Sequence, residues 1–353
     1  MSFTETKRRE IRKYLLRKID EDDPLLIGKV SDAFGISPTS VRRYLTTETG
    51  AGHIESSKEN ACGYQLKTTC ISHSYKLSEL SEFDDDLAFE DASFVLPESR
   101  EALRIWEYGL TEIFNNAISH SGGSKSKVFI EKNHLYTSVS ISDDGVGIFT
   151  NIVDAMKRSG INNPQIRDAI VELYKGKFTS MPGKHSGEGI FFTMQLFDKM
   201  AIISDGNILR RGYEGSPSII KSHLISYAQK ISKTGTVVIM KLENDTAKNI
   251  TEILNRFSNT DEGFTKTRIP VLEACLDREP VSRSQARRIC TRLEKFKEVE
   301  LDFQKIDFMG QGFADEMFRV FHNEHPEIIL TPTNMTADVN NMYLCTIHNK
   351  VMS

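Results

Sequence analysis

The stretch that decides the fold is residues 107–118, which read EYGLTEIFNNAI. It lies within a predicted helix over about residues 98–120, on which Glu112 and Asn116 are one turn apart and share a face. Mg²⁺ takes hard oxygen ligands together with phosphates and water, so the amide oxygen of Asn116 is a candidate metal ligand. Glu112 beside it would orient a water as a general base. Polar residues on one helix face are also typical of a solvated surface, so this stretch is not sufficient alone.

A second stretch, residues 140–148, reads SISDDGVGI and runs from a predicted strand directly into two glycines. Gly145 and Gly147 would let a flat ring approach the backbone. A carboxylate oxygen of Asp143 would accept a hydrogen bond from an exocyclic amine. By itself the stretch is more typical of an Asp-Gly turn in a hairpin.

Two further stretches place glycine before a regular element. Residues 185–192, HSGEGIFF, put Gly187 and Gly189 at the start of a helix, where free backbone amides hold anionic phosphate. Gly235 and Thr236 precede a predicted alternating strand over residues 237–242, and the Thr236 hydroxyl would hydrogen-bond a ligand or simply fit the strand. The sequence has no G-x-x-x-x-G-K-[ST] motif, so a nucleotide-binding fold other than the P-loop must be considered.

In this order and spacing, the four stretches resemble the nucleotide-binding boxes of the GHKL ATPase superfamily, which includes gyrase, mismatch-repair and heat-shock ATPases, histidine kinases and anti-sigma serine kinases. The resemblance spans roughly residues 98–245 and implies a two-layer α/β sandwich that binds ATP and Mg²⁺ between its helices and its sheet. It implies that Asn116 ligates Mg²⁺ and that Asp143, supported by Thr236, binds the adenine amine. The glycines implied to line the base pocket or to meet the phosphates are Gly145, Gly147, Gly187 and Gly189.

The resemblance also implies a mobile ATP lid over residues 149–186. Lys175, Lys177 or Lys184 would reach phosphate from this lid, or would simply lie on its solvated face. Of the three, Lys184 is the candidate that we assign to cofactor binding.

Glu112 determines the chemistry that we predict. It lies four residues before Asn116, as does the glutamate that acts as general base in the hydrolysing members of the superfamily and in the anti-sigma kinases. Histidine kinases usually have asparagine there, and no long helical hairpin with a phospho-accepting histidine is recognisable, which disfavours a histidine kinase. The resemblance therefore implies slow Mg-dependent ATP hydrolysis. The alternative is that Glu112 caps or pairs structurally.

Near the N-terminus, residues 30–45, VSDAFGISPTSVRRYL, predict two short helices joined by a tight turn. Gly35 supplies a left-handed turn after the first helix, Ser37 a side-chain N-cap, and Pro38 the first position of the second helix. Val41 would then face the core. The outer residues, which would meet phosphate or guanine edges of DNA, are Thr39, Ser40, Arg42 and Arg43.

This stretch closely resembles the helix-turn-helix of winged-helix bacterial repressors, with residues 51–66 as the wing. Before it, residues 1–18 combine clustered Lys and Arg with apolar residues at three- and four-residue steps, which predicts a basic amphipathic helix. Because the chain has a net charge of −4, any contact with nucleic acid must be local. We therefore expect DNA binding through residues 1–66. The alternative is a helical hairpin that packs on a neighbouring domain.

The last part of the chain predicts a small sheet buried against helices. The expected elements are helix 283–296, strand 299–306, loop 307–312, helix 313–322 and strand 328–330. This succession resembles STAS-like domains related to anti-sigma-factor antagonists. Such antagonists usually carry a phosphorylatable Ser or Thr in the loop after the strand, and the loop here contains neither, which puts a serine-phosphorylation switch in doubt. The domain would dock on the ATPase unit or on a protein partner, or serve as a folding or dimer-forming appendage.

The composition is that of an ordinary globular chain of two or three domains, with 353 residues, 39% hydrophobic and 27% charged. Five cysteines without a C-x-x-C pair fit reduced thiols, and no apolar run is long enough to span a bilayer, so we expect a cytoplasmic protein without membrane contact. The predicted fold class is α+β. Its domains are a winged helix-turn-helix at 1–75, a linker at 76–95, a GHKL domain at 96–262 and a STAS-like domain at 263–353.

Together these patterns favour an ATP-binding transcription regulator in which the nucleotide state of a GHKL domain modulates a DNA-binding head. One alternative is an anti-sigma-type serine kinase or partner-switching module, with the tail as an internal antagonist mimic. Another is an enzyme whose ATP turnover is stimulated by DNA, although no nuclease or tyrosine-transfer segment is recognisable. A homodimer is compatible with each.

Overall fold

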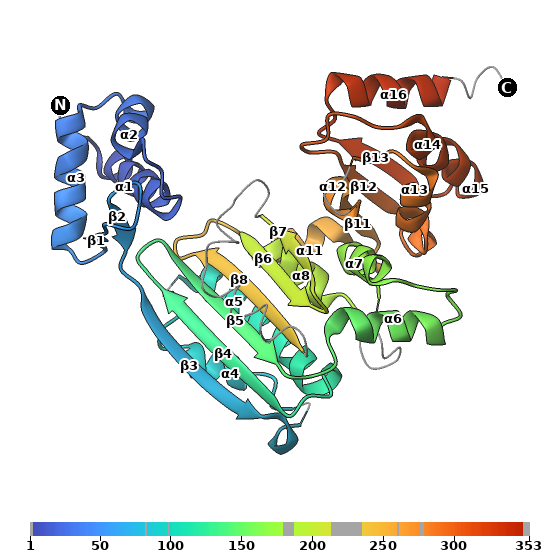
Figure 1. The fold of residues 1–353 in the computed structure, drawn as a ribbon, viewed down its shortest axis with the longest axis horizontal. Helices are drawn as coiled ribbons and strands as arrows, with labels where there is room; N and C mark the ends of the chain where they lie inside the picture. Colours follow the sequence, from blue (N-terminus) through green and yellow to red (C-terminus); the bar gives the residue numbers. More distant parts are fainter. Residues whose placement is uncertain are drawn as a thin grey trace.

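The computed structural model describes residues 3–81, 83–97, 99–178, 187–212, 235–259, 261–275 and 279–348. In chain order these form a helical head, a central body built on an antiparallel sheet, and a C-terminal unit with a small parallel sheet. The head and the C-terminal unit lie on opposite sides of the central body, and each carries one chain terminus (Figure 1). The mixed α and β class is as predicted.

The head consists of three helices and a short hairpin, which are α1 (Glu5–Asp20), α2 (Leu26–Phe34), α3 (Pro38–Gly50), β1 (Ile54–Ser56) and β2 (Tyr64–Leu66). The predicted turn between α2 and α3 is confirmed, because Gly35 has a φ of 62° and Ser37 Oγ accepts a hydrogen bond from Ser40 N at 3.1 Å. The left-handed φ favours glycine, which has no Cβ to strain. Val41 is fully buried, so α3 packs on the head through one face only.

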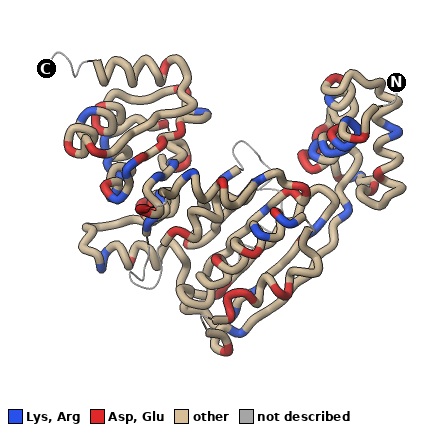
Figure 2. Tube along the Cα trace, turned by 180° about the vertical axis from the view of Figure 1, so that it is seen from behind, with Lys and Arg blue, Asp and Glu red and all other residues tan. Residues whose placement is uncertain are grey.

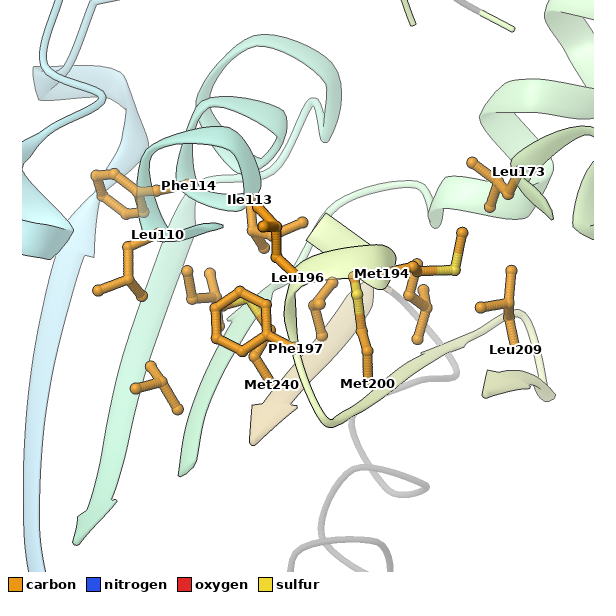
Figure 3. Close-up of a cluster of buried hydrophobic side chains, with 14 of the residues drawn as sticks. Leu110, Ile113, Phe114, Leu173, Met194, Leu196, Phe197, Met200, Leu209 and Met240 are labelled. Carbon is orange, nitrogen blue, oxygen red and sulfur yellow. The ribbon is translucent and has the colours of Figure 1, made fainter. Parts of the chain in front are cut away.

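The central body is a six-stranded antiparallel sheet with the strand order β3-β4-β5-β8-β6-β7. Its strands are β3 (Thr69–Lys76), β4 (Lys125–Lys132), β5 (Tyr136–Asp143), β6 (Lys199–Ser204), β7 (Asn207–Arg211) and β8 (Thr236–Glu243). Its helices are α4 (Leu87–Ala92), α5 (Arg100–His120), α6 (Ile148–Arg158), α7 (Ile166–Lys175), α8 (Gly189–Leu196) and α11 (Ile250–Phe257). Figure 3 shows the apolar layer that joins helices to strands, with Leu110 and Phe114 of α5 above Met240 of β8.

One boundary differs from the prediction, which gave residues 1–75 to the head and 76–95 to a linker. Strand β3 pairs along its whole length with β4, so it is the edge strand of the central sheet. The Tyr75 ring packs on Phe114 at 4.8 Å, and its hydroxyl donates to Asp91 at 2.8 Å. After a 3₁₀ turn, η1 (Leu77–Glu79), helix α4 buries Ala88 and Ala92 on α5. Most of the expected linker is therefore part of the central body.

The C-terminal unit is built on a three-stranded parallel sheet with the order β11-β12-β13. Its strands are β11 (Lys266–Pro270), β12 (Glu298–Asp302) and β13 (Ile329–Thr333), and a two-residue pair, β9 (Ser258–Asn259) and β10 (Gly263–Phe264), precedes them. Its helical segments are α12 (Val271–Ala274), α13 (Arg283–Cys290), η2 (Leu293–Lys295), α14 (Gln311–Ala314), η3 (Asp315–Phe321), α15 (His322–Glu324) and α16 (Ala337–His348). The predicted helix 283–296 is shorter than expected, because Arg292 adopts a left-handed φ of 63° that ends it.

The C-terminal unit packs directly on the central body. Val171 of α7 and Phe191 and Phe192 of α8 belong to the same buried cluster as the core of the parallel sheet. Phe264 contributes its ring to this cluster, 4.8 Å from the ring of Phe191. The unit is therefore docked on the central body within the chain through an apolar interface, which is one of the roles expected for it.

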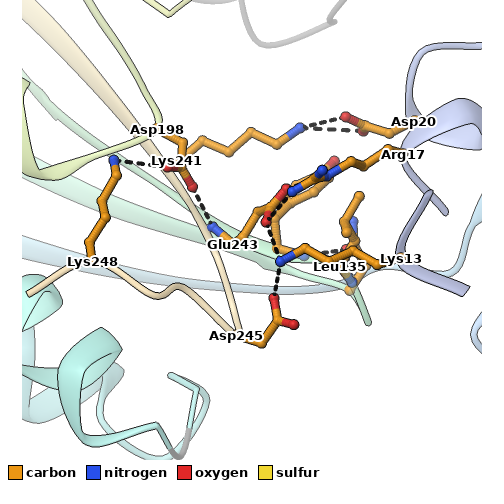
Figure 4. Close-up of polar contacts among 11 residues, drawn as sticks. Lys13, Arg17, Asp20, Leu135, Asp198, Lys241, Glu243, Asp245 and Lys248 are labelled. Atoms are coloured by element: carbon orange, nitrogen blue, oxygen red, sulfur yellow. Dashed lines mark hydrogen bonds and ion pairs between the residues drawn. The ribbon is translucent and has the colours of Figure 1, made fainter. Parts of the chain in front are cut away.

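The head is held on the central body by ion pairs between α1 and the end of β8 (Figure 4). Lys13 Nζ lies 2.7 Å from both Glu243 and Asp245, and Arg17 Nε lies 2.7 Å from Glu243. Figure 2 shows basic and acidic residues gathered where the head meets the sheet. The predicted basic helix is thus present, but several of its cations are paired within the chain.

Candidate functional site

A cavity of about 510 Å³ lies between the helices and the sheet of the central body. Its lining includes residues from all four stretches identified in the sequence, although Glu112 and Thr236 are 124 positions apart along the chain. The predicted residues that the structure brings together here are Glu112, Asn116, Asp143, Gly147, Gly187, Gly189 and Thr236. Its volume is within the range usual for small-molecule sites.

Asp143 ends strand β5 at the floor of the cavity. Its Oδ1 accepts hydrogen bonds from Gly145 N at 2.9 Å and Thr236 N at 3.3 Å, while Oδ2 has no partner among the described residues. Burial raises the pKa of Asp143 to about 6, although the two backbone donors oppose this shift. One oxygen is thus held by the backbone, and the other is left as an acceptor for a donor that the described chain does not supply.

The two glycines after Asp143 have different roles. Gly147 lines the cavity with a φ of 91°, and a Cβ there would lie 2.6 Å from Asp205. Ile148 N, the next amide, donates to Thr236 Oγ1 at 2.9 Å. Gly145 does not line the cavity, contrary to our expectation, because it packs against the end of α5, where a Cβ would overlap the Ser121 carbonyl.

Glu112 and Asn116 project together from α5 into the cavity, as their spacing predicted. Asn116 Nδ2 donates to the Glu112 carbonyl at 2.8 Å, which leaves the side-chain oxygen of Asn116 without a partner among the described residues. Burial, with smaller contributions from Asp85 and Glu188, raises the pKa of Glu112. Among the described residues this carboxylate has no hydrogen-bond or ion-pair partner.

Gly189 begins α8 and Gly187 lies two residues before it, and both line the cavity beside α5. A Cβ at Gly189 would overlap the Glu112 carboxylate, so glycine is required for the close approach of this acid to the helix. The first backbone amides of a helix are not used by its own hydrogen bonds, and they favour negative charge. The arrangement therefore combines a helix N-terminus, a carboxylate and an amide oxygen around one volume.

The described part of the expected lid, residues 149–178, forms the helices α6 and α7, while Lys184 lies outside the described residues. The prediction that Lys175 contacts phosphate is wrong. It is only 1% exposed, pairs with Glu172 at 2.8 Å and donates to the carbonyl of Thr291. Lys177 donates to the carbonyl of Lys295 at 2.7 Å. Both lysines bind the C-terminal unit, because α7 packs directly on that unit.

Sequence reasoning missed several lining residues, which are Tyr108, Asn151, Leu173, Phe178, Leu254 and Ser258. Tyr108 lies one turn before Glu112, so helical spacing alone would have identified it. Leu254 and Ser258 come from α11 and β9, beyond the span of the resemblance. No local pattern marks them, because they reach the cavity through tertiary packing.

The residues predicted to meet DNA lie on the outer face of α3. Thr39, Arg42 and Arg43 are exposed, and Ser40 is half-buried with its Oγ 3.0 Å from Ser37 Oγ in the helix cap. Neither arginine side chain has a hydrogen-bond or ion-pair partner among the described residues. Helix α3 forms the outer edge of the head in Figure 1. The two guanidinium groups are therefore available to an external anion.

Comparison with known proteins identifies one part of the chain. No curated protein matches it. Within the described ranges, no helix combines the length and the apolar content that a membrane crossing requires. Residues 285–340 match the family described as a STAS-like domain of unknown function (DUF4325). This match covers β12, β13 and the helices between them, so the C-terminal unit contains a STAS-like domain.

Proposed function

We propose that this protein is a GHKL-type ATPase whose cavity binds ATP with Mg²⁺, and whose nucleotide state modulates a winged-helix, DNA-binding head. The observation that carries the proposal is the convergence of four distant segments on one cavity with unpartnered polar atoms. Oxygens of Glu112, Asn116 and Asp143 that have no partner among the described residues line one cavity, and convergent polar groups in a cavity favour a polar ligand.

The residues present fit an adenine nucleotide. Asp143 Oδ2 is an acceptor for the exocyclic amine of adenine, and Gly147 leaves room beside it for a flat ring. Asn116 would hold Mg²⁺ through its amide oxygen, since this ion takes few protein ligands and keeps phosphates and waters. The start of α8 at Gly189 would meet phosphate. The ion would neutralise phosphate charge when bound.

Glu112 would act as the general base. Its unpaired carboxylate is about one helical turn from Asn116, which places it beside the proposed metal ligand. The raised pKa makes it a stronger base than an ordinary glutamate. It would accept a proton from a water that attacks the terminal phosphate.

The head would bind DNA through α3 rather than through α1. Arg42 and Arg43 are exposed and unpaired in the described chain, whereas Lys13 and Arg17 of α1 are paired with the central sheet. Helix-turn-helix proteins place the second helix of the motif in the major groove. The hairpin of β1 and β2 would be the wing.

Strands β5 and β8 support the proposed coupling between nucleotide and DNA. Each has one end at the cavity, Asp143 or Thr236, and the other end at the head, Tyr136 or Glu243. An eight-residue strand spans roughly 25 Å. A ligand shifts the head only if it binds one head arrangement better than another.

Calorimetry of the full chain with a non-hydrolysable ATP analogue and Mg²⁺ tests the site. We expect saturable binding of one nucleotide per chain and weaker binding of the inosine analogue, which lacks the amine. Failure of both analogues to bind would overturn the proposal.

The DNA-binding part has its own test. We expect the double variant Arg42→Ala, Arg43→Ala to weaken duplex affinity and to reduce the salt dependence by about one ion for each phosphate that an arginine no longer neutralises. Arg9→Ala is the matched control, because Arg9 pairs with Asp245 at 3.1 Å. Equal affinities with and without the Mg-bound analogue would remove the coupling and leave nucleotide binding intact.

A second candidate is a serine kinase or partner-switching module of the anti-sigma type. The STAS-like domain favours it, because it docks on α7, which also lines the cavity through Leu173. The two candidates differ in where the terminal phosphate goes. Radiolabel from the γ-phosphate on protein would support the kinase, and label recovered only as inorganic phosphate would support the ATPase.

A further inference from the structure

Three metal-ligating side chains meet where the head contacts the turn between β4 and β5. Glu48 lies near the end of α3, His53 lies between α3 and β1, and His134 lies at the tip of the turn. One ligand atom from each lies within 4.8 Å of the other two. The group is remote from the cavity, and none of its members lines it.

The contacts within this group already orient two of its members. His53 Nδ1 lies 2.7 Å from one oxygen of Glu48, whose side chain is only 2% exposed. Arg12 Nε lies 3.3 Å from the other oxygen. The rings of His53 and His134 stack with their centroids 3.5 Å apart and their planes 11° from parallel.

The position of His134 is fixed by its neighbours. Leu135, the next residue, is 6% exposed and packs into the core of the head. Asn133 Oδ1 accepts hydrogen bonds from Leu135 N and Tyr136 N, both at 2.9 Å, which closes the turn. The turn therefore inserts into the head and presents an exposed imidazole beside His53.

We propose that Glu48, His53 and His134 form a binding site for a divalent transition metal of the zinc class. Two imidazoles with one carboxylate are a recurrent zinc donor set, and three protein ligands leave a position for water. Magnesium and calcium prefer all-oxygen sites, so imidazole nitrogens select against them. Arg12 would hold the carboxylate from behind, as outer-shell partners of metal ligands do.

Binding requires one movement. The lone pair of an imidazole nitrogen lies in the ring plane, so two parallel stacked rings cannot both direct a nitrogen at one ion. His134 is exposed and has room to turn about its Cβ–Cγ bond, whereas Glu48 is held by burial and by Arg12. The ion would replace the ring stack as the link between the two histidines.

The site would bridge two parts of the molecule. Glu48 and His53 belong to the head, and His134 belongs to the central body. A bound ion would therefore fix the orientation of the head, independently of the α1 ion pairs. This inference does not depend on nucleotide binding.

Equilibrium dialysis and cobalt absorption spectroscopy of the chelator-treated full chain test the site. We expect one Zn²⁺ per chain, retained in excess Mg²⁺, and cobalt bands without thiolate charge transfer, which excludes the cysteines as ligands. His53→Ala and His134→Ala should each lose this ion. The matched control is His325→Ala, because His325 also lies beside a glutamate, 3.3 Å from Glu327, but belongs to no group of three metal-ligating side chains among the described residues.

Thermal unfolding shows whether a variant without zinc has lost only the metal site or has misfolded. His134 is exposed, so His134→Ala should melt like the wild type without metal, while Zn²⁺ should raise the melting temperature of the wild type alone. No ion on the wild type, or undiminished zinc on both histidine variants, would overturn the proposal.

Discussion

The cavity and the head junction each contain a glutamate and an aspartate, but the pKa values of these carboxylates are shifted in opposite directions in the two places. Burial raises the pKa of Glu112 and of Asp143, and neither has an ion-pair partner in the described chain. Burial alone would also raise the pKa values of Glu243 and Asp245, but their bonds to cations of α1 outweigh it and lower both. An unpaired buried carboxylate destabilises the fold, so its retention favours a role with a ligand.

The largest expected effect is on the rate of ATP hydrolysis. If Glu112 is the general base, Glu112→Gln should lower Mg-dependent ATP hydrolysis by about 10²- to 10⁴-fold while nucleotide affinity is retained. Steady-state phosphate release and calorimetry measure the two quantities separately. The matched control is Glu107→Gln, an exposed acid on the same helix, which should leave the rate unchanged. Wild-type turnover in the Glu112 variant would remove it from the mechanism.

The next effect concerns nucleotide affinity. Asp143→Asn keeps an Oδ1 acceptor for both backbone donors but replaces the unpartnered oxygen with an amide donor. A hydrogen bond to a charged group contributes about 1.5–3 kcal/mol, so affinity for the ATP analogue should fall about 10- to 100-fold. The preference for the ATP analogue over the inosine analogue should also disappear.

The control for this variant is Asp144→Asn. Asp144 is exposed and accepts from Ser124 and Lys125 outside the cavity, so its replacement should leave the affinity unchanged. An equal fall in affinity in the two variants would mean that the turn, rather than the acceptor at Asp143, determines binding.

Asp143→Asn should also stabilise the nucleotide-free protein. Because the pKa of Asp143 is about 6 in the folded state against an ordinary 3.8, its charge destabilises the fold above pH 6 and not below pH 4. The wild type should therefore lose stability as pH rises through this window, and Asp143→Asn should recover up to about 3 kcal/mol at pH 8. Urea unfolding at pH 4 and pH 8 checks the sign, and a variant less stable than the wild type at pH 8 would refute it.

The sequence predicts this molecule best where the interactions are local. The turn of Gly35 and Ser37 follows from backbone stereochemistry, and the shared face of Glu112 and Asn116 follows from helical spacing. Lys175 shows the limit. It reads as an exposed lid residue, yet it is buried because α7 packs on a unit that begins about ninety residues later in the chain.

The boundary at residue 75 was wrong, and the basic helix, although present as predicted, has partners within the chain that the sequence does not indicate. Both follow from the same limit. Residues 69–76 alternate as a strand should, but nothing local indicates that their partner is β4 rather than the wing. The cations of α1 predict an anionic partner correctly, and that partner is Glu243 and Asp245 of the same chain. Charge in a sequence therefore indicates the sign of a partner and not its location.

The smallest expected effect is at the head junction. Arg17 and Glu243 form two hydrogen bonds, at 2.7 and 2.8 Å, but the arginine side chain is 47% exposed and Lys13 also binds Glu243. A double-mutant cycle with Arg17→Ala and Glu243→Ala should therefore give a coupling of about 0.2–1 kcal/mol in urea unfolding. The coupling should shrink at about 1 M salt, where the screening length falls to about 3 Å.

A matched cycle on Lys7 and Glu10, a pair within α1 whose side chains are 43% and 55% exposed, should give a smaller coupling still. If the Arg17 coupling exceeded about 2 kcal/mol and resisted salt, Arg17 and Glu243 would behave as a buried ion pair. The junction carboxylates would then differ from those of the cavity only in having a cation as partner, and not in exposure to solvent. A salt-sensitive value below about 1 kcal/mol would instead mean that ion pairs orient the head without holding it rigidly, which is the condition under which a ligand at the far ends of β5 and β8 shifts its position.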